Sequence, residues 1–204
     1  PSNRIVFTAG AKEVDNEIWV MNGDGTNQQQ LTANDVDDVD PAWTPDGNRV
    51  FWIQIEANGI DGSIWQMNTD GSGPSRLAGP FRYLSHLAIS SDGQRIVFDA
   101  DLTGDYANDV AVIGIDGTNL TTIAEGYVYD VGLYLNVGEM WAGSWTPDDR
   151  LILYSALEYY VDNNGVTFLK ATINSYCLVS NNCPGTAMQD VQLNYNPDIA
   201  NTDF

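Results

Sequence analysis

The stretch Pro41-Ala-Trp-Thr-Pro-Asp-Gly-Asn-Arg-Val50 contains the unit from which the fold can be predicted. A short apolar segment, Ala42-Trp43, precedes a Thr-Pro-Asp-Gly turn, and an Arg-led strand, Arg49-Val-Phe-Trp52, follows it. Proline presets φ for a turn, and glycine supplies the positive φ that tight hairpins require. The stretch therefore predicts two antiparallel strands joined by a tight turn.

This unit recurs along the chain. Four Arg-led strands resemble one another at spacings of 45, 46 and 55 residues, namely Arg4–Phe7, Arg49–Trp52, Arg95–Phe98 and Arg150–Leu153. A third strand, such as Ile64-Trp-Gln-Met-Asn68, and an Asp-Gly turn follow in the first three repeats. We therefore predict four repeats of about four antiparallel strands, with approximate bounds 4–47, 49–93, 95–149 and 150–204.

The repeats predict a single all-β domain over residues 1–204, a β-propeller of four-stranded antiparallel blades. One such sheet cannot bury both of its faces, whereas sheets stacked around an axis can do so. Trp43 and Trp145 share one repeat position, and we interpret them as wedges between blades. The alternative is a β-sandwich with a coincidental repeat.

The pattern of residues 41–50, followed by Ile64-Trp-Gln-Met-Asn68, Asp70-Gly71 and Arg76-Leu77, resembles the WD-like repeat of TolB-type propellers. The resemblance covers nearly the whole chain and weakens after Tyr154. It implies a propeller of the bacterial envelope that serves as a binding platform without chemistry. Family members generally have six blades, whereas four repeats are visible here.

The charge of the chain is strongly unbalanced. It has 28 Asp and Glu residues against 8 Lys and Arg residues, for a net charge of −20. Such a chain repels phosphate backbones and anionic lipid, so we expect no nucleic-acid partner. No apolar run approaches the roughly 18 residues that cross a bilayer, so we expect no membrane insertion.

The sequence offers little for catalysis. The single histidine, His86, follows Ser85, and any Ser/His/Asp arrangement would have to use it. No Gly-x-Ser-x-Gly elbow, phosphate-binding loop or zinc-ligand spacing accompanies it. We therefore interpret His86 as a structural residue and expect the chain not to be an enzyme.

Calcium is the one cofactor that the sequence suggests. The densest acidic segment carries four carboxylates, Asp35, Asp37, Asp38 and Asp40. Oxygen ligands at such spacing could hold calcium, although the segment lacks the glycine and distal glutamate of an EF-hand loop. The alternative is an exposed connection between blades without any cofactor.

Two cysteines, Cys177 and Cys183, flank a short segment in the fourth repeat. In an oxidising compartment this pair could close a small loop as a disulfide, and the alternative is two unpaired thiols. The predicted disulfide, the presence of only two lysines (Lys12 and Lys170) and the TolB resemblance favour an extracellular or periplasmic location.

Several aromatic residues fall outside the repeat pattern. Aromatic residues in exposed loops are favoured in interfaces, and the alternative is simple loop packing. The candidate interaction residues lie in the insert before the fourth repeat and in a later connection: Tyr127, Tyr129, Tyr134, Trp141, Tyr159 and Tyr160.

The function expected from these observations is that of a non-catalytic protein-interaction propeller with an unidentified protein partner. One alternative is a structural subunit of an extracellular assembly or filament, built by strand donation. Another is a carbohydrate-binding or hydrolytic propeller. Fold alone does not decide among them.

The two ends of the chain suggest how a ring could close. The first repeat lacks its inner strand, and Ile199–Phe204 followed by Pro1–Phe7 resembles the strand–turn–strand of the other repeats. We predict that Ile199–Phe204 pairs with Arg4–Phe7 and closes the propeller. The alternatives are donation of this strand to a neighbouring chain and further blades outside this sequence.

Overall fold

The computed structural model describes residues 3–10, 15–130, 135–161 and 167–178. All helical or extended elements assigned in these ranges are β-strands, so the all-β prediction is confirmed. Within the same ranges, no helix has the length and apolar character needed to cross a membrane.

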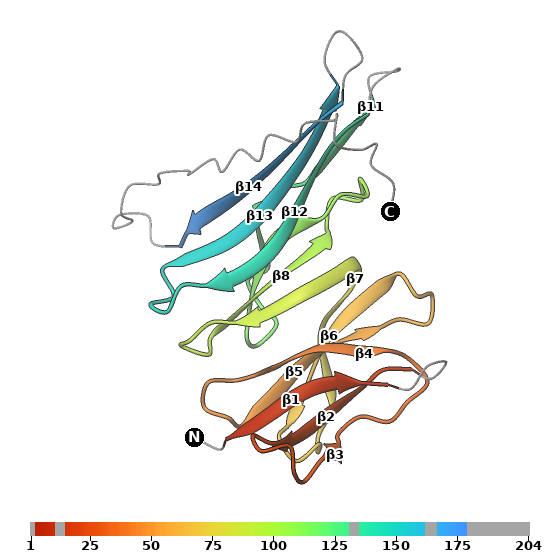
Figure 1. The fold of residues 1–204 in the computed structure, drawn as a ribbon, viewed down its shortest axis with the longest axis vertical. Helices are drawn as coiled ribbons and strands as arrows, with labels where there is room; N and C mark the ends of the chain where they lie inside the picture. Colours follow the sequence, from red (N-terminus) through yellow and green to blue (C-terminus); the bar gives the residue numbers. More distant parts are fainter. Residues whose placement is uncertain (1–2, 11–14, 131–134, 162–166, 179–204) are drawn as a thin grey trace, which may run out of the picture.

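The strands form three antiparallel sheets (Figure 1). The first sheet contains β1 (Arg4–Ala9), β2 (Glu17–Asn22) and β3 (Gln29–Gln30). The second contains β4 (Asp38–Trp43), β5 (Arg49–Ile55), β6 (Asp61–Asn68), β7 (Ser75–Ile89), β8 (Arg95–Asp101), β9 (Asp109–Gly114) and β10 (Thr121–Ala124). The third contains β11 (Tyr127–Asp130), β12 (Leu135–Trp145), β13 (Leu151–Val161) and β14 (Thr167–Cys177).

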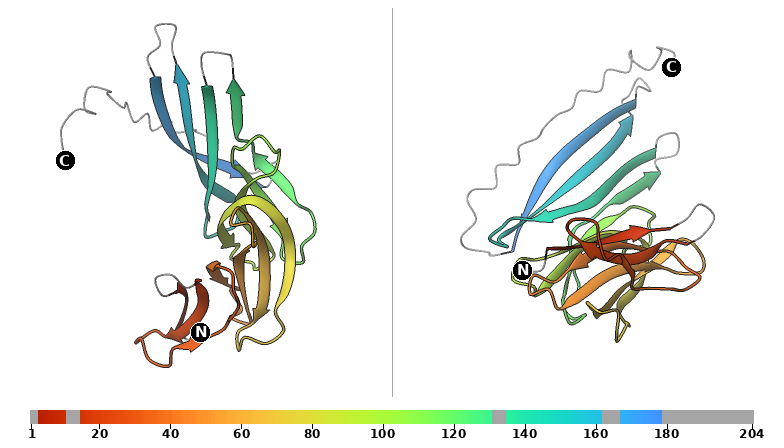
Figure 2. Two further views of the ribbon diagram at one scale, coloured as in Figure 1. Left: turned by 90° about the vertical axis from the view of Figure 1, so that its right-hand side faces the viewer. Right: turned by 60° about the horizontal axis from the view of Figure 1, so that its bottom comes forward.

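The seven-stranded sheet consists of two blades that share β7. Residues 75–82 of this strand pair with β6, and residues 82–89 pair with β8. Within the first part lies Gly79, with a φ of 104°, where an added Cβ would sit 2.9 Å from the Cα of Ser63. Only glycine fits this conformation and close approach, and Figure 2 shows β7 as one long curved strand.

Four blades therefore follow one another along the long axis of the molecule (Figure 1). Blade 1 is β1–β3, blade 2 is β4–β6 with the first part of β7, blade 3 is the second part of β7 with β8–β10, and blade 4 is β11–β14. The inner strands are β4, the second part of β7, and β12, which occupy the same position in their repeats.

Each pair of neighbouring blades encloses an apolar core. Between blades 1 and 2 lie Ile18, Val50, Trp52 and Met67, with Trp43 packed against them. Between blades 2 and 3 lie Phe51, Ile53, Ile64, Ile96 and Phe98 among others. Between blades 3 and 4 lie Val97, Val110, Val112, Trp145 and Ile152 among others. Because the blades stack in this way, blades 2 and 3 each bury both of their faces.

The two tryptophans at the shared repeat position are wedges between blades, as predicted. Trp145 is buried, and its Nε1 donates a hydrogen bond of 3.1 Å to the carbonyl of Ala88 in blade 3. The guanidinium of Arg95 lies 4.9 Å from the ring centroid of Trp145. Arg4 lies at 5.6 Å over Trp43 in the same way. Arginine from one blade thus contacts tryptophan of the next by a cation–π interaction.

The alignment of Arg150 with the other Arg-led positions is wrong by one residue. The amide of Arg49 donates to Thr44 Oγ1 at 3.0 Å, and the equivalent bond to Thr146 Oγ1 comes from Leu151. The turn therefore fixes the register, and Arg150 takes the turn position of Asn48. Because side chains alternate along a strand, this shift decides which residues of β13 face blade 3.

Some predictions concern residues outside the described ranges. The closing strand, Ile199–Phe204, is among them, so closure and the number of blades stay predictions.

Candidate functional site

The inner strands of blades 2, 3 and 4 share an irregularity at the same level. The pairing register shifts between Val39 and Ala42 in β4, between Ser85 and Ala88 in β7, and between Ala142 and Ser144 in β12. Such bulges bend a strand and redirect a side chain, and they are frequent near functional sites. Their repetition in three blades indicates a feature at the axis of the molecule.

Two of these bulges contain strained residues. Asp40 has a φ of 51° and His86 a φ of 54°, values that are uncommon for residues other than glycine. The two residues occupy the same repeat position, and the amide of His86 donates a hydrogen bond of 3.1 Å to Asp40 Oδ2. Strain that the surrounding structure maintains is a pointer to function.

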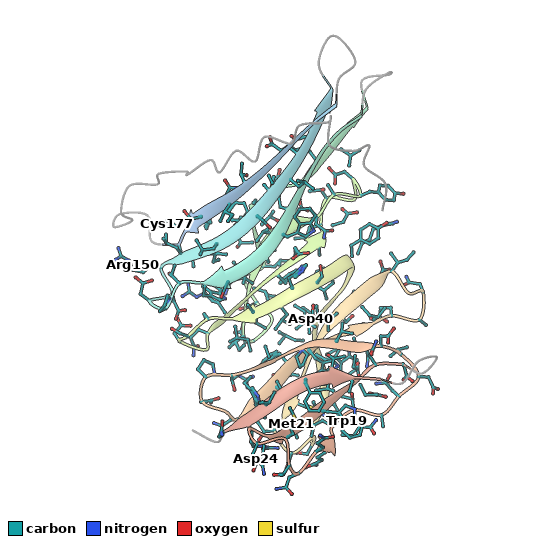
Figure 3. All side chains as sticks on the ribbon, viewed as in Figure 1. Trp19, Met21, Asp24, Asp40, Arg150 and Cys177 are labelled. Atoms are coloured by element: carbon teal, nitrogen blue, oxygen red, sulfur yellow. The ribbon has the colours of Figure 1, made fainter. Side chains whose placement is uncertain are left out.

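These residues line one cavity of about 410 Å³. All four blades contribute to its wall, which consists of Val6, Phe7, Asp40, Pro41, His86, Leu87, Ala142 and Gly143. Figure 3 shows Asp40 between the lower and upper blades. We call this cavity the axial pocket. The wall combines apolar and polar residues, and polar groups that converge on a concave surface are a common feature of ligand sites.

A buried carboxylate orients the imidazole of His86. Nδ1 of His86 lies 2.9 Å from Oδ1 of Asp99, whose side chain is fully buried, whereas 56% of the His86 side chain is exposed. In the described part of the chain, Nδ1 is the only ring nitrogen with a hydrogen-bond partner. The carboxylate therefore fixes the ring, and Nε2 is left for a ligand.

Asp99 also links blade 3 to blade 4. Its carboxylate accepts hydrogen bonds from Ser85 Oγ at 2.6 Å, from Asn108 Nδ2 at 3.0 Å and from the Ala142 amide of β12 at 3.0 Å. A buried carboxylate is costly unless it is hydrogen-bonded, and here both oxygens have donors.

The hydrogen bond to Asp99 raises the pKa of His86 above its ordinary value of 6.5. A raised pKa means that the folded state binds the proton more tightly than the unfolded state. The stabilisation is therefore complete below about pH 6.5 and is lost as the pH rises through the folded-state pKa. We expect the melting temperature of the protein to fall across this window.

Thermal melts at pH 5.5 to 9 of the wild type and His86→Asn check this expectation. His86 is the only histidine, so the difference between the two melting curves isolates its contribution. The variant should lack this component of the pH dependence. Parallel dependences in both proteins would contradict the expectation.

The four carboxylates proposed for calcium do not converge. Asp38 is fully buried and accepts bonds from Trp52 Nε1 at 2.8 Å and Gln54 Nε2 at 3.1 Å. Asp37 accepts from the amide and the side chain of Asn16, Asp40 contacts His86, and Asp35 is exposed. Among the described residues no group of three or more His, Cys, Asp or Glu residues could hold a metal ion. Calcium binding stays a prediction, and the geometry gives it no support.

The aromatic candidates lie on strands, which corrects their placement in loops. Tyr127 and Tyr129 are in β11, Trp141 is in β12, and Tyr159 and Tyr160 are in β13. Tyr134 lies outside the described residues. The insert lengthens blade 4 by one strand, because β11 pairs antiparallel with β12. An interaction role of these residues stays a prediction.

The structure describes only one of the two cysteines. Cys177 is the last residue of β14, and Cys183 lies outside the described residues. The disulfide therefore stays a prediction.

The Asp99 network was not predicted, although the sequence holds a signal for it. Once the repeats are aligned, Asp99 occupies the position of Ile53, which is fully buried in blade 2. A carboxylate at a core position needs a partner, and the histidine at the bulge of the neighbouring strand supplies it.

Solved structures of other proteins have a similar fold. No family model matches the chain, and no curated protein does. The structure is similar to TolB from Acinetobacter baumannii, with a TM-score of 0.60 and 14% identity over 84% of this chain and 50% of that one. It is also similar to a TolB from Agrobacterium tumefaciens, with a TM-score of 0.63 and 15% identity over 87% of this chain and 61% of that one.

Another similar structure is that of the tricorn protease, with a TM-score of 0.59 and 9% identity over 95% of this chain and 19% of that one. The chain thus has a TolB-like β-propeller fold, and it spans between half and two thirds of the length of the two TolB structures. At such identities the likeness concerns the fold alone.

Proposed function

We propose that this chain is a non-catalytic protein-interaction propeller of the cell envelope or the extracellular space, and that it binds its partner at the axial pocket. The observation that carries the proposal is the repeated bulge. The bulges of blades 2 and 3 place Asp40 and His86 at one cavity, and all four blades contribute residues to the wall of this cavity.

The pocket suggests the chemistry of the partner. Phe7, Pro41 and Leu87 are among the apolar residues that line it, and the exposed Asp40 adds a carboxylate. The net charge of −20 attracts cations to the whole molecule. A peptide segment with an apolar side chain beside a lysine or arginine would satisfy both features.

Binding is favoured over hydrolysis by the position of Ser85. A serine nucleophile needs its hydroxyl hydrogen-bonded to an imidazole base. The single proton of the Ser85 hydroxyl is donated to Asp99, so serine and histidine share the carboxylate instead of forming a relay. The proposed location in the envelope relies on the TolB-like fold, the low lysine content and the predicted disulfide.

Substitutions of Asp40 test the proposed site. Asp40→Asn keeps an oxygen that can accept the His86 amide and suits the positive φ, so it changes mainly the charge. Asp40→Lys reverses the charge. We expect a protein captured from an envelope extract by the immobilised wild type to be retained less by Asp40→Asn and to be lost with Asp40→Lys.

Asp70→Asn is the matched control. Asp70 lies in the turn after β6, remote from the axial pocket, and its Oδ1 accepts the Ser72 amide as an asparagine oxygen can. Its substitution should leave capture unchanged. Equal retention by the wild type and both Asp40 variants would refute binding at the axial pocket.

A further inference from the structure

The internal blades define which repeat positions pack between blades. In blade 2, Val50, Trp52 and Met67 face blade 1, whereas Phe51 and Ile64 face blade 3. The same alternation holds in blade 3, where Ile96 and Phe98 face blade 2 and where Val97 and Val110 face blade 4. Each blade thus has one face toward its predecessor and a different face toward its successor.

Blade 1 has an apolar predecessor face with no predecessor among the described blades. Ile5 pairs with Met21 and Phe7 with Trp19, just as Val50 pairs with Met67 and Trp52 with Trp65 in blade 2. The third strands of the two blades even share the sequence Ile-Trp-x-Met-Asn. Yet Ile5 is 42% exposed, whereas its equivalent Val50 is fully buried.

Blade 4 likewise has an apolar successor face with no successor among the described blades. Leu153 is 41% exposed and Ile173 is 61% exposed. Their equivalents, Val97 and Val110 in blade 3, are fully buried against blade 4. Positions that are buried at the internal interfaces are therefore exposed at both ends of the molecule.

We infer that a second copy of this chain covers these faces, with blade 4 of one copy packed on blade 1 of the next. The contact would continue the internal interface, because a successor face meets a predecessor face whose residue types match those of blade 2. The two faces lie at opposite ends of the molecule (Figure 1), and Trp19 and Met21 mark the lower end in Figure 3. This packing of sheet faces differs from the donation of a strand.

Such a contact is heterologous, since it joins two different surfaces. It closes into a ring if the rotation permits and otherwise produces an open series of copies. The net charge of −20 on each copy opposes the contact. Salt screens that repulsion, so association should strengthen as the ionic strength increases.

The test measures the mass of the full chain by sedimentation velocity over a range of concentrations at low and high salt. Wild type should form species of two or more copies. Ile5→Asp and Ile173→Asp each place a charge in the contact, so each should weaken association roughly 30-fold or more, as a hot-spot residue does. Ile60→Asp is the control, because Ile60 is 44% exposed but lies in the turn between β5 and β6.

A mixture of the two variants identifies the geometry. Ile5→Asp keeps its blade 4 face and Ile173→Asp keeps its blade 1 face, so an equimolar mixture should form two-copy species and nothing larger. Melting temperatures close to that of the wild type show that each variant is folded.

Three results would overturn the inference. One is a wild type with the mass of a single copy at every concentration and salt. Another is association that neither Ile5→Asp nor Ile173→Asp weakens. The third is a single-copy wild type that associates once residues 179–204 are deleted, because that segment would then be the cover of blade 4.

Discussion

Asp99→Ala is expected to lower the free energy of unfolding by about 3–5 kcal/mol, the range for breaking a buried charged hydrogen-bond network. Its carboxylate has partners on β7, on the segment before β9 and on β12, and alanine would leave their donors without an acceptor. At about 2–4 °C per kcal/mol for a chain of this size, the melting temperature should fall by roughly 6–20 °C. Calorimetric or circular-dichroism melts measure the change.

Two variants sharpen this expectation. Asp99→Asn retains one acceptor for the Ala142 amide, so it should cost less than alanine, and it should also remove the pH dependence assigned to His86. The exposed Asp35, changed to alanine, should stay within about 0.5 kcal/mol of the wild type. A loss for Asp99→Ala no larger than for Asp35→Ala would show that the network does not join blades 3 and 4.

Trp145→Ala should be comparably destabilising, by about 3–5 kcal/mol, the range for removing a large aromatic side chain from a core. The substitution empties the core between blades 3 and 4 and removes both the bond to Ala88 and the contact with Arg95. Chemical denaturation, followed by the fluorescence of the remaining tryptophans, measures the loss.

Phenylalanine at the two wedge positions provides a matched comparison. Trp145→Phe leaves the Ala88 carbonyl without its donor and should cost about 1–2 kcal/mol more than Trp43→Phe. In the described part of the chain the Nε1 of Trp43 is buried without a hydrogen-bond partner, so its loss removes no bond. Equal costs for the two substitutions would mean that the bond to Ala88 contributes nothing.

The repeat architecture could be predicted because its signals are local. A Thr-Pro-Asp turn fixes its own conformation, and a tryptophan that immediately precedes such a turn in two repeats occupies the same packing position in both. The register of the fourth repeat could not be obtained from the Arg-led pattern, because Arg150 and Arg49 look alike in sequence. The turn hydrogen bond to Thr146 decides between Arg150 and Leu151.

The site was less accessible to sequence reasoning. His86 and Asp99 are thirteen residues apart, on opposite sides of a hairpin, and only the pairing of β7 with β8 brings them together. The aromatic insert was interpreted as a loop because an unusual spacing suggested an insertion. In the structure Tyr127 and Tyr129 extend a sheet instead, because their strand β11 pairs with β12, a non-local contact that the sequence spacing does not reveal.

The shared strand β7 has a mechanical consequence. Blades 2 and 3 cannot separate unless the hydrogen bonds of a continuous ladder break, because one strand belongs to both. The other two joints have no shared strand and hold through apolar packing and separate hydrogen bonds, such as that of Asn16 to Asp37 between blades 1 and 2 and that of the Ala142 amide to Asp99 between blades 3 and 4. A load applied to the first and last blades would therefore separate the blades at one of these two joints before it separated blades 2 and 3.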